Sequence, residues 1–311
     1  MHGGHHHHGH DHHGHGHAHG HGHAPAVSDA RWVIAVVLNL AFVAAEGAAG
    51  VIANSTALLA DAGHNLSDVL GLVMGGVAVW LAKRPPDPRR TYGWGKATVL
   101  ASLANAVALV FACGAIAWEA MHRFGASEPP ASGTIMAVAA AGVLVNGATA
   151  LLFLRGRKED ANVRGAFLHM AADAAVSAGV IAAGALIFFT GKAWIDPAVS
   201  LVVVAVILWG TWGLLKEALH LAMDAVPYGI DPAAVEACLA GRPGVSAVHD
   251  LHVWPISTRE VALTAHLVMP EGGDDAFLRD TAATLKARFG IVHATIQVEA
   301  AAIHGCEDLH G

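Results

Sequence analysis

Long apolar runs alternate with short polar connections along the first two thirds of the chain. A helix needs about 20 apolar residues to cross the hydrocarbon core of a bilayer, and each run has close to that length or more. The connection between the first two runs is so short that it predicts a tight antiparallel hairpin. The pattern therefore predicts an all-α, six-helix transmembrane domain at residues 31–226, with spans at 32–53, 57–82, 97–122, 134–154, 165–190 and 197–222.

After residue 226 the pattern changes to that of a small globular domain. Asp231 followed by Pro232 is typical of a helix start, because an N-cap carboxylate accepts from the first turn and proline fits the first helical position. Strand-like alternation and a further helical stretch follow. Residues 227–300 are expected to form an α+β domain with the order αββαβ, at 231–239, 245–254, 260–269, 274–289 and 291–299, and residues 301–311 a flexible tail.

The first 23 residues contain 13 histidines interleaved with glycine. This stretch lacks the basic start and apolar middle of a signal peptide. An affinity tag is the alternative interpretation, but tags are usually unbroken histidine runs. Residues 1–30 are therefore predicted to be a disordered, histidine-rich arm that binds metal loosely and raises its local concentration.

Composition and charge identify the molecular environment. Hydrophobic residues make up 54% of the 311 residues and charged residues only 14%, which is typical of a protein embedded in a lipid bilayer. The net charge of −7 comes without a basic block, so nucleic acid is not an expected partner. The three cysteines indicate no disulfide framework.

The basic residues are concentrated in two connections. Five follow the second span and four follow the fourth, whereas the opposite connections carry only Arg123 and Lys192. By the positive-inside rule, the basic connections and both termini are cytoplasmic. The chain is thus expected to be a multi-pass integral membrane protein whose α+β domain lies in the cytoplasm.

A repeated frame, histidine followed four residues later by aspartate, lies within the second and fifth spans. It occurs as His64 with Asp68 and as His169 with Asp173. Residues four apart share one helix face, so each pair can direct two ligands to one point near mid-membrane. Two imidazoles and two carboxylates suit a tetrahedral first-row ion, above all Zn²⁺. Charges buried in a membrane are expensive unless they are functional, so these residues are candidate metal ligands.

Two further acidic residues lie in the predicted spans. Glu46 in the first span is a candidate proton or ion relay. Asp61 is expected near the outer end of the second span, where its charge can reach interfacial water.

The α+β domain has a high density of histidine. A second metal site using His249, His266 and His293 is one interpretation, and surface or hydrogen-bonded imidazoles are the other. The expected ligand is again Zn²⁺, in a regulatory role.

Three classes of protein could use a metal site within the membrane. A zinc hydrolase needs an open coordination position and a general base such as the glutamate of HExxH, and this sequence contains no HExxH. A metal-sensing receptor could use the arm and the α+β domain but has no need of ligands at mid-membrane. Four ligands from two spans favour a transporter, which is not an enzyme.

Four stretches together resemble the cation diffusion facilitator family in its zinc-transporting branch. They are LLADAGHNLSD at 58–68, RRTYGWGKA at 89–97, LHMAADAAVS at 168–177 and VHDLHVW at 248–254. The resemblance implies six spans, a cytoplasmic ferredoxin-like domain, a homodimer and export of divalent metal in exchange for protons, here at the bacterial inner membrane. By motif position it implies His64, Asp68, His169 and Asp173 as the transport ligands. Thr98 departs from the family pattern, because relatives commonly carry glutamate there.

Overall fold

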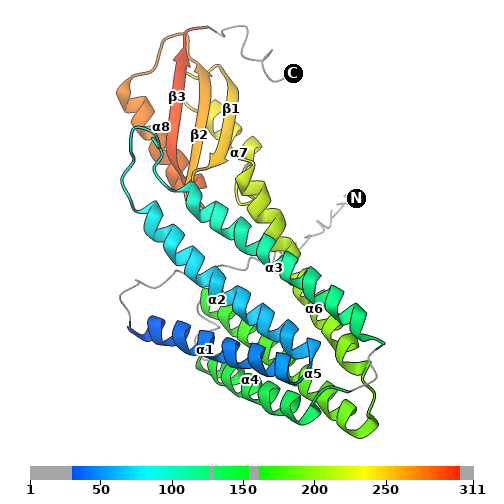
Figure 1. The fold of residues 1–311 in the computed structure, drawn as a ribbon. Helices are drawn as coiled ribbons and strands as arrows, with labels where there is room; N and C mark the ends of the chain where they lie inside the picture. Colours follow the sequence, from blue (N-terminus) through cyan, green and yellow to red (C-terminus); the bar gives the residue numbers. More distant parts are fainter. Residues whose placement is uncertain (1–29, 126–128, 154–160, 302–311) are drawn as a thin grey trace, which may run out of the picture.

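The computed structural model describes residues 30–125, 129–153 and 161–301, in which a bundle of long helices precedes a small α+β domain (Figure 1). The expected N-terminal arm and nearly all of the expected tail lie outside the described residues. Each helix of the bundle begins and ends within a few residues of the range that the apolar pattern predicts. These helices are α1 (Ala30–Ile52), α2 (Thr56–Ala82), α3 (Lys96–Arg123), α4 (Ser132–Phe153), α5 (Ala161–Thr190) and α6 (Ile195–Ala222).

The described helices include four stretches that are long and apolar enough to cross a bilayer. They are Thr56–Ala82, Lys96–Arg123, Met170–Thr190 and Ile195–Ala222. In α1 and α4 the described apolar stretches are shorter, at Leu40–Ile52 and Ser132–Ala148. Large apolar side chains such as Phe111, Phe189 and Trp209 are exposed on the outside of the bundle. Lipid can solvate such side chains where water cannot, so this part is a helical transmembrane domain.

Helix α2 holds the bundle together. It packs against α1, α3 and α6 and also touches α5, while α4 packs along α5. Leu58 belongs to a buried cluster with residues of α4 and α5, and Ala60 to a second cluster with residues of α3 and α6. The first half of α2 is therefore fixed on both sides, which determines which of its faces meets α5.

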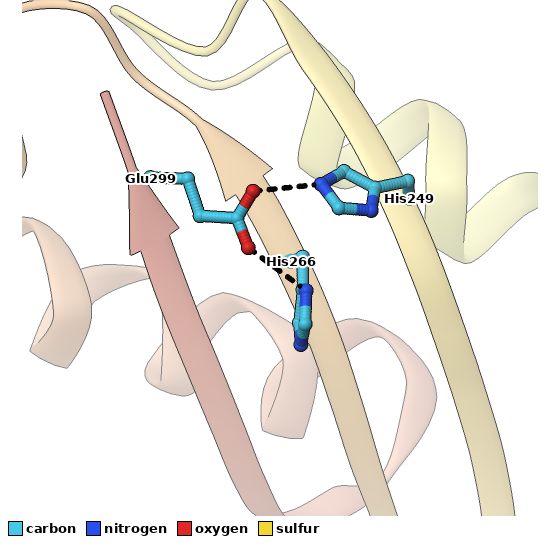
Figure 2. A group of neighbouring side chains, drawn as sticks. All are labelled: His249, His266 and Glu299. Carbon is cyan, nitrogen blue, oxygen red and sulfur yellow. Dashed lines mark hydrogen bonds and ion pairs between the residues drawn. The ribbon is translucent and has the colours of Figure 1, made fainter. Parts of the chain in front are cut away.

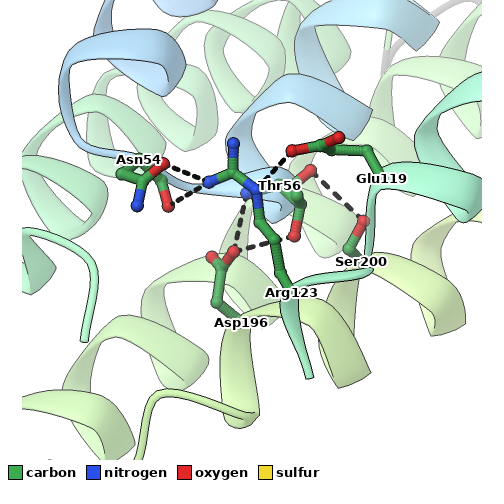
Figure 3. A network of polar contacts seen from close by, with 6 residues as sticks. All are labelled: Asn54, Thr56, Glu119, Arg123, Asp196 and Ser200. Carbon is green, nitrogen blue, oxygen red and sulfur yellow. Dashed lines mark hydrogen bonds and ion pairs between the residues drawn. The ribbon is translucent and has the colours of Figure 1, made fainter. Parts of the chain in front are cut away.

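The start of α2 is fastened to α6 by one buried carboxylate (Figure 3). Asp196 accepts hydrogen bonds from the Thr56 backbone N–H at 2.6 Å, from Thr56 Oγ1 at 2.8 Å and from the Ser55 hydroxyl. Ser200 Oγ donates in turn to the Thr56 carbonyl at 3.2 Å. An acceptor at a helix N-terminus satisfies backbone donors that the helix leaves unpaired. Here that acceptor comes from another helix, so it also joins α2 to α6.

The hairpin between α1 and α2 is also tied to α3 (Figure 3). Asn54 adopts a left-handed backbone with φ of 55°, which asparagine tolerates better than most residues. Arg123 at the end of α3 donates to the Asn54 carbonyl at 2.9 Å and to the Asn54 side chain, and its Nε binds Glu119 at 2.7 Å. This end of the bundle is thus held by polar contacts among α2, α3 and α6.

The α+β domain has the predicted order αββαβ: α7 (Pro232–Ala240), β1 (Ala247–Pro255), β2 (Val261–Val268), α8 (Asp275–Phe289) and β3 (Ile291–Glu299). The sheet order is β1-β2-β3, with β1 antiparallel and β3 parallel to the central β2. Asp231 and Asp274 cap the two helices, as side-chain acceptors at an N-cap should. Leu239, Leu263 and Leu285 lie in the buried core between the helices and the sheet.

The two domains meet where α3 begins. Lys96 Nζ donates to the Pro255 carbonyl at 2.9 Å and forms an ion pair with Asp224, just after α6. Thr98 Oγ1 donates to the Gly95 carbonyl at 2.8 Å and accepts from the Thr258 backbone N–H at 3.0 Å. Thr98 therefore contacts the β1–β2 turn directly.

Replacing Asp196 tests the contact between α2 and α6. In Asp196→Ala, three buried donors at the start of α2 lose a charged acceptor, which is expected to cost about 2–4 kcal/mol. Thermal unfolding of the purified protein in detergent measures the effect. Glu119→Ala is the matched control, because its ion pair is exposed and worth at most about 1 kcal/mol. Equal unfolding midpoints for the two variants would contradict the role of Asp196 in joining α2 to α6.

Candidate metal sites

Three acidic or imidazole side chains of α2 lie on the face that meets α5. Asp61, His64 and Asp68 follow one another at spacings of three and four residues, which places them along one side of the helix. His64 is about 12 Å along a helix that is about 40 Å long, well away from either end. The α2 face is thus positioned to present ligands inside the bundle.

His64 meets Asp173 across the contact between α2 and α5. His64 Nε2 lies 3.3 Å from Asp173 Oδ1 and 3.7 Å from Asp68 Oδ2. One ligand atom from each of the three residues lies within 4.8 Å of the others, as a shared metal ion requires. The Asp173 side chain is 4% exposed, that of His64 15% and that of Asp68 32%. Three of the four expected ligands are therefore gathered at one point.

The fourth expected ligand, His169, is in α5 one helical turn before Asp173. Its side chain lies outside the part of the structure that is described.

The chemistry of this group favours a divalent cation. Two carboxylates so close together repel each other in a medium of low dielectric constant unless a positive charge lies between them. An imidazole nitrogen beside them adds a ligand that suits zinc and its neighbours in the first transition row.

Asp61 lies deeper in the protein than the sequence suggests. We expected its charge to reach interfacial water, but the residue is fully buried and Ser177 Oγ of α5 donates to its Oδ2 at 3.0 Å. The expectation was wrong because neighbouring helices cover this end of α2. Glu46 of α1 is also fully buried, and Asn65 Nδ2 donates to its Oε2 at 3.1 Å.

A second group lies on the sheet of the α+β domain (Figure 2). His249 of β1 and His266 of β2 are directly paired across the two strands. The Glu299 carboxylate of β3 bridges them, with Oε2 at 3.0 Å from His249 Nε2 and Oε1 at 3.0 Å from His266 Nδ1. Glu299 is buried, and the three ligand atoms are close enough together to hold one metal ion.

The structure does not bring His293 to this group. His293 is exposed near the start of β3, where its ring makes an edge contact with Tyr92 at 5.3 Å between centroids. Glu299 is six residues further along the strand, or about 20 Å at the usual rise. The expected set of three histidines is thus replaced by two histidines and Glu299.

Strand register is the reason why the sequence did not reveal Glu299. His266 lies opposite Gln297, which puts the end of β3 beside the histidine pair and the start of β3 far from it. A β-bulge between His249 and His252 also turns Asp250 towards the group, with its Oδ2 at 3.5 Å from His266 Nε2. Alternation along each strand predicts which face a residue occupies, but not the offset between strands.

Two protein-family models match the chain. The cation efflux transmembrane domain matches residues 32–221, and the cytoplasmic domain of cation efflux proteins matches residues 227–301. Together they cover both domains that the structure describes.

Several known transporters are similar over most of their length. The chain is 38% identical over 267 residues to the zinc transporter ZitB of Escherichia coli (strain K12), which covers 85% of each protein. It is 35% identical over 270 residues to the metal cation efflux system protein CzcD of Cupriavidus metallidurans, covering 86% of this chain and 85% of the relative. It is 33% identical over 274 residues to the cadmium, cobalt and zinc/H(+)-K(+) antiporter of Bacillus subtilis, covering 86% and 87%. The chain therefore belongs to the cation efflux family of membrane transporters, the family that its sequence motifs indicate, and it is not an enzyme.

Proposed function

We propose that the protein exports zinc from the cytoplasm in exchange for protons, through a site formed by His64, Asp68, His169 and Asp173. The observation that carries this proposal is the approach of His64 to Asp173 across two helices, 3.3 Å apart inside the transmembrane domain. The zinc transporter among the relatives supports the choice of metal. The relative named as a cadmium, cobalt and zinc/H(+)-K(+) antiporter supports exchange with protons.

The contacts between α2 and α5 support His169 as the fourth ligand. Asp61 binds Ser177, and three residues further along α2, His64 meets Asp173, four residues earlier in α5. The two helices thus run antiparallel where they touch. One more turn along this contact brings residue 169 level with Asp68, at the spacing of one helical turn.

A site with two carboxylates and two neutral imidazoles neutralises Zn²⁺. Four protein ligands close the tetrahedral shell, which suits carrying an ion rather than activating a bound water for hydrolysis. Zinc binds only to deprotonated ligands, so metal binding and proton release are linked. An inward proton gradient can then drive zinc out of the cell as the site alternates between the two sides.

The exposure of the ligands supports access from the cytoplasm. Asp68 is about one-third exposed, while Asp173 and Asp61 are buried. A carboxylate within a bilayer is far less costly against water than against lipid, so the exposed edge of the site marks its aqueous side. Asp68 lies near the middle of α2 and is one turn closer than His64 to the end that leads to Lys83 and Arg84. By the positive-inside rule this end faces the cytoplasm.

The same topology implies that α1 and α4 also cross the membrane. They contain 23 and 22 residues, enough to span the hydrocarbon core at about 1.5 Å per residue. Six spans place both termini in the cytoplasm, in the bacterial inner membrane. The histidine-rich arm is then on the side from which zinc is taken.

The cytoplasmic domain is proposed to be ferredoxin-like and to join two copies of the chain in a homodimer. The αββαβ order and the parallel β2–β3 pair joined through α8 support the fold. We also propose that His249, His266 and Glu299 bind a regulatory zinc ion. Such an ion would take the place of the two contacts that the Glu299 carboxylate makes with the imidazoles of His249 and His266.

Zinc flux across a vesicle membrane distinguishes a transporter from a metal-sensing receptor. A receptor with the same ligands would bind zinc without moving it across vesicles.

Transport by single-site variants tests the ligand set. Asp68→Ala, Asp173→Ala and His169→Ala are each expected to lower zinc flux into proteoliposomes by more than about tenfold, since even partners of metal ligands contribute that much. Glu119→Gln, an exposed carboxylate of α3, is the matched control and should transport normally. Near-normal flux in a correctly inserted Asp173→Ala protein would contradict the site.

Local hydrogen exchange tests the cytoplasmic site in the full chain. Zinc should slow amide exchange in β1, β2 and the end of β3, because one ion would link all three strands. Glu299→Gln is expected to remove this protection, whereas His293→Ala is expected to keep it. Equal protection by zinc in wild type and Glu299→Gln would show that the group binds no metal.

A further inference from the structure

Two acidic residues outside the four metal ligands meet inside the bundle. Glu46 of α1 and Asp61 of α2 are both fully buried. Glu46 is bound by Asn65, which lies one helical turn after Asp61 on the same face of α2, so both carboxyl groups lie at the contact between α1 and α2. Neither residue has a role in the metal-binding group.

Each carboxyl group has one neutral donor. Asn65 Nδ2 donates to Glu46 Oε2 at 3.1 Å, and Ser177 Oγ donates to Asp61 Oδ2 at 3.0 Å. The other two oxygens, Glu46 Oε1 and Asp61 Oδ1, are buried and accept no hydrogen bond from the described residues. The pair therefore has two oxygen acceptors that lack a donor.

A proton resolves both problems of this arrangement. Two buried carboxylates at one helix contact would carry two like charges in a medium of low dielectric constant, which strongly favours neutralising one of them. A single proton held between them removes one charge and provides the missing donor. In coupled carboxylate pairs such a proton belongs to the pair rather than to either residue.

We propose that Glu46 and Asp61 together hold a proton that is exchanged for zinc, separately from the metal ligands. This inference rests on the proposed zinc/proton exchange and names a residue pair that carries its proton. Asp61 is one turn from His64 on α2, and its partner Ser177 is one turn from Asp173 on α5. Zinc at the ligands is therefore close enough to expel the proton by electrostatic repulsion, and the proton leaves to water on the side to which the site is open.

The surroundings contain few other groups that could supply this proton. The titratable residues one helical turn away are His64, three residues after Asp61 on α2, and Asp173, four residues before Ser177 on α5. Helix α4 has no titratable residue in its sequence. Around the first half of α2, α3 contributes Cys113 and α6 contributes Asp196, which is engaged with Thr56.

Counting protons tests the proposal. The full-length protein in detergent is saturated with Zn²⁺ near pH 7 in weak buffer, and the protons released per chain are measured. Glu46→Gln and Asp61→Asn are each expected to release about one proton fewer than wild type. The double variant should also lose about one proton and not two, because the pair shares it. Thr211→Val, a buried hydroxyl of α6 that binds only its own helix, should release the wild-type number.

A conservative variant separates proton binding from a structural role. Glu46→Asp keeps an ionisable group and is expected to restore the proton lost in Glu46→Gln. Wild-type release in both neutral variants would overturn the proposal, as would a loss that Glu46→Asp does not restore. Exchange itself is tested separately, since wild-type protein that transports zinc without moving any proton would refute the proposed function whatever the variants do.

Discussion

The architecture depends on bringing a buried acidic side chain of α5 against an imidazole of α2 inside a membrane. Asp173 is almost completely buried, and its Oδ1 lies 3.3 Å from His64 Nε2. A buried acidic group inside a membrane needs a compensating partner, and here the partner is a residue of the proposed metal-binding group. Helix α5 touches α2 far less than it packs on α4, and Leu58 of α2 is buried with apolar residues of both helices. The contact between His64 and Asp173 is therefore the polar link between these two helices on which the proposed transport site depends.

Polar contacts with neighbouring helices fix one end of the contact between α2 and α5. Asp196 joins the start of α2 to α6, and Arg123 joins the preceding hairpin to α3. At the other end of the bundle, Lys96 binds the end of β1 and Thr98 binds the β1–β2 turn of the α+β domain.

The sequence predicted the elements well because the bilayer and helical periodicity impose strong patterns. Apolar runs located α1 to α6 to within a few residues, and the spacing from His64 to Asp68 placed both on one face. The sequence could not predict contacts between elements. The burial of Asp61 depends on Ser177, which is 116 residues away, and the choice of Glu299 over His293 depends on strand register. Neither follows from local pattern, since each is decided by how separate elements pack.

X-ray absorption at the zinc edge tests the central claim most directly. The protein lacking residues 2–23 and carrying Glu299→Gln, loaded with one zinc per chain, should show four nitrogen or oxygen ligands at about 2.0–2.1 Å, with the outer-shell scattering of two imidazoles. Asp173→Ala in the same background should lose this coordination. Six oxygen ligands, a sulfur ligand, or a spectrum that Asp173→Ala leaves unchanged would contradict the account.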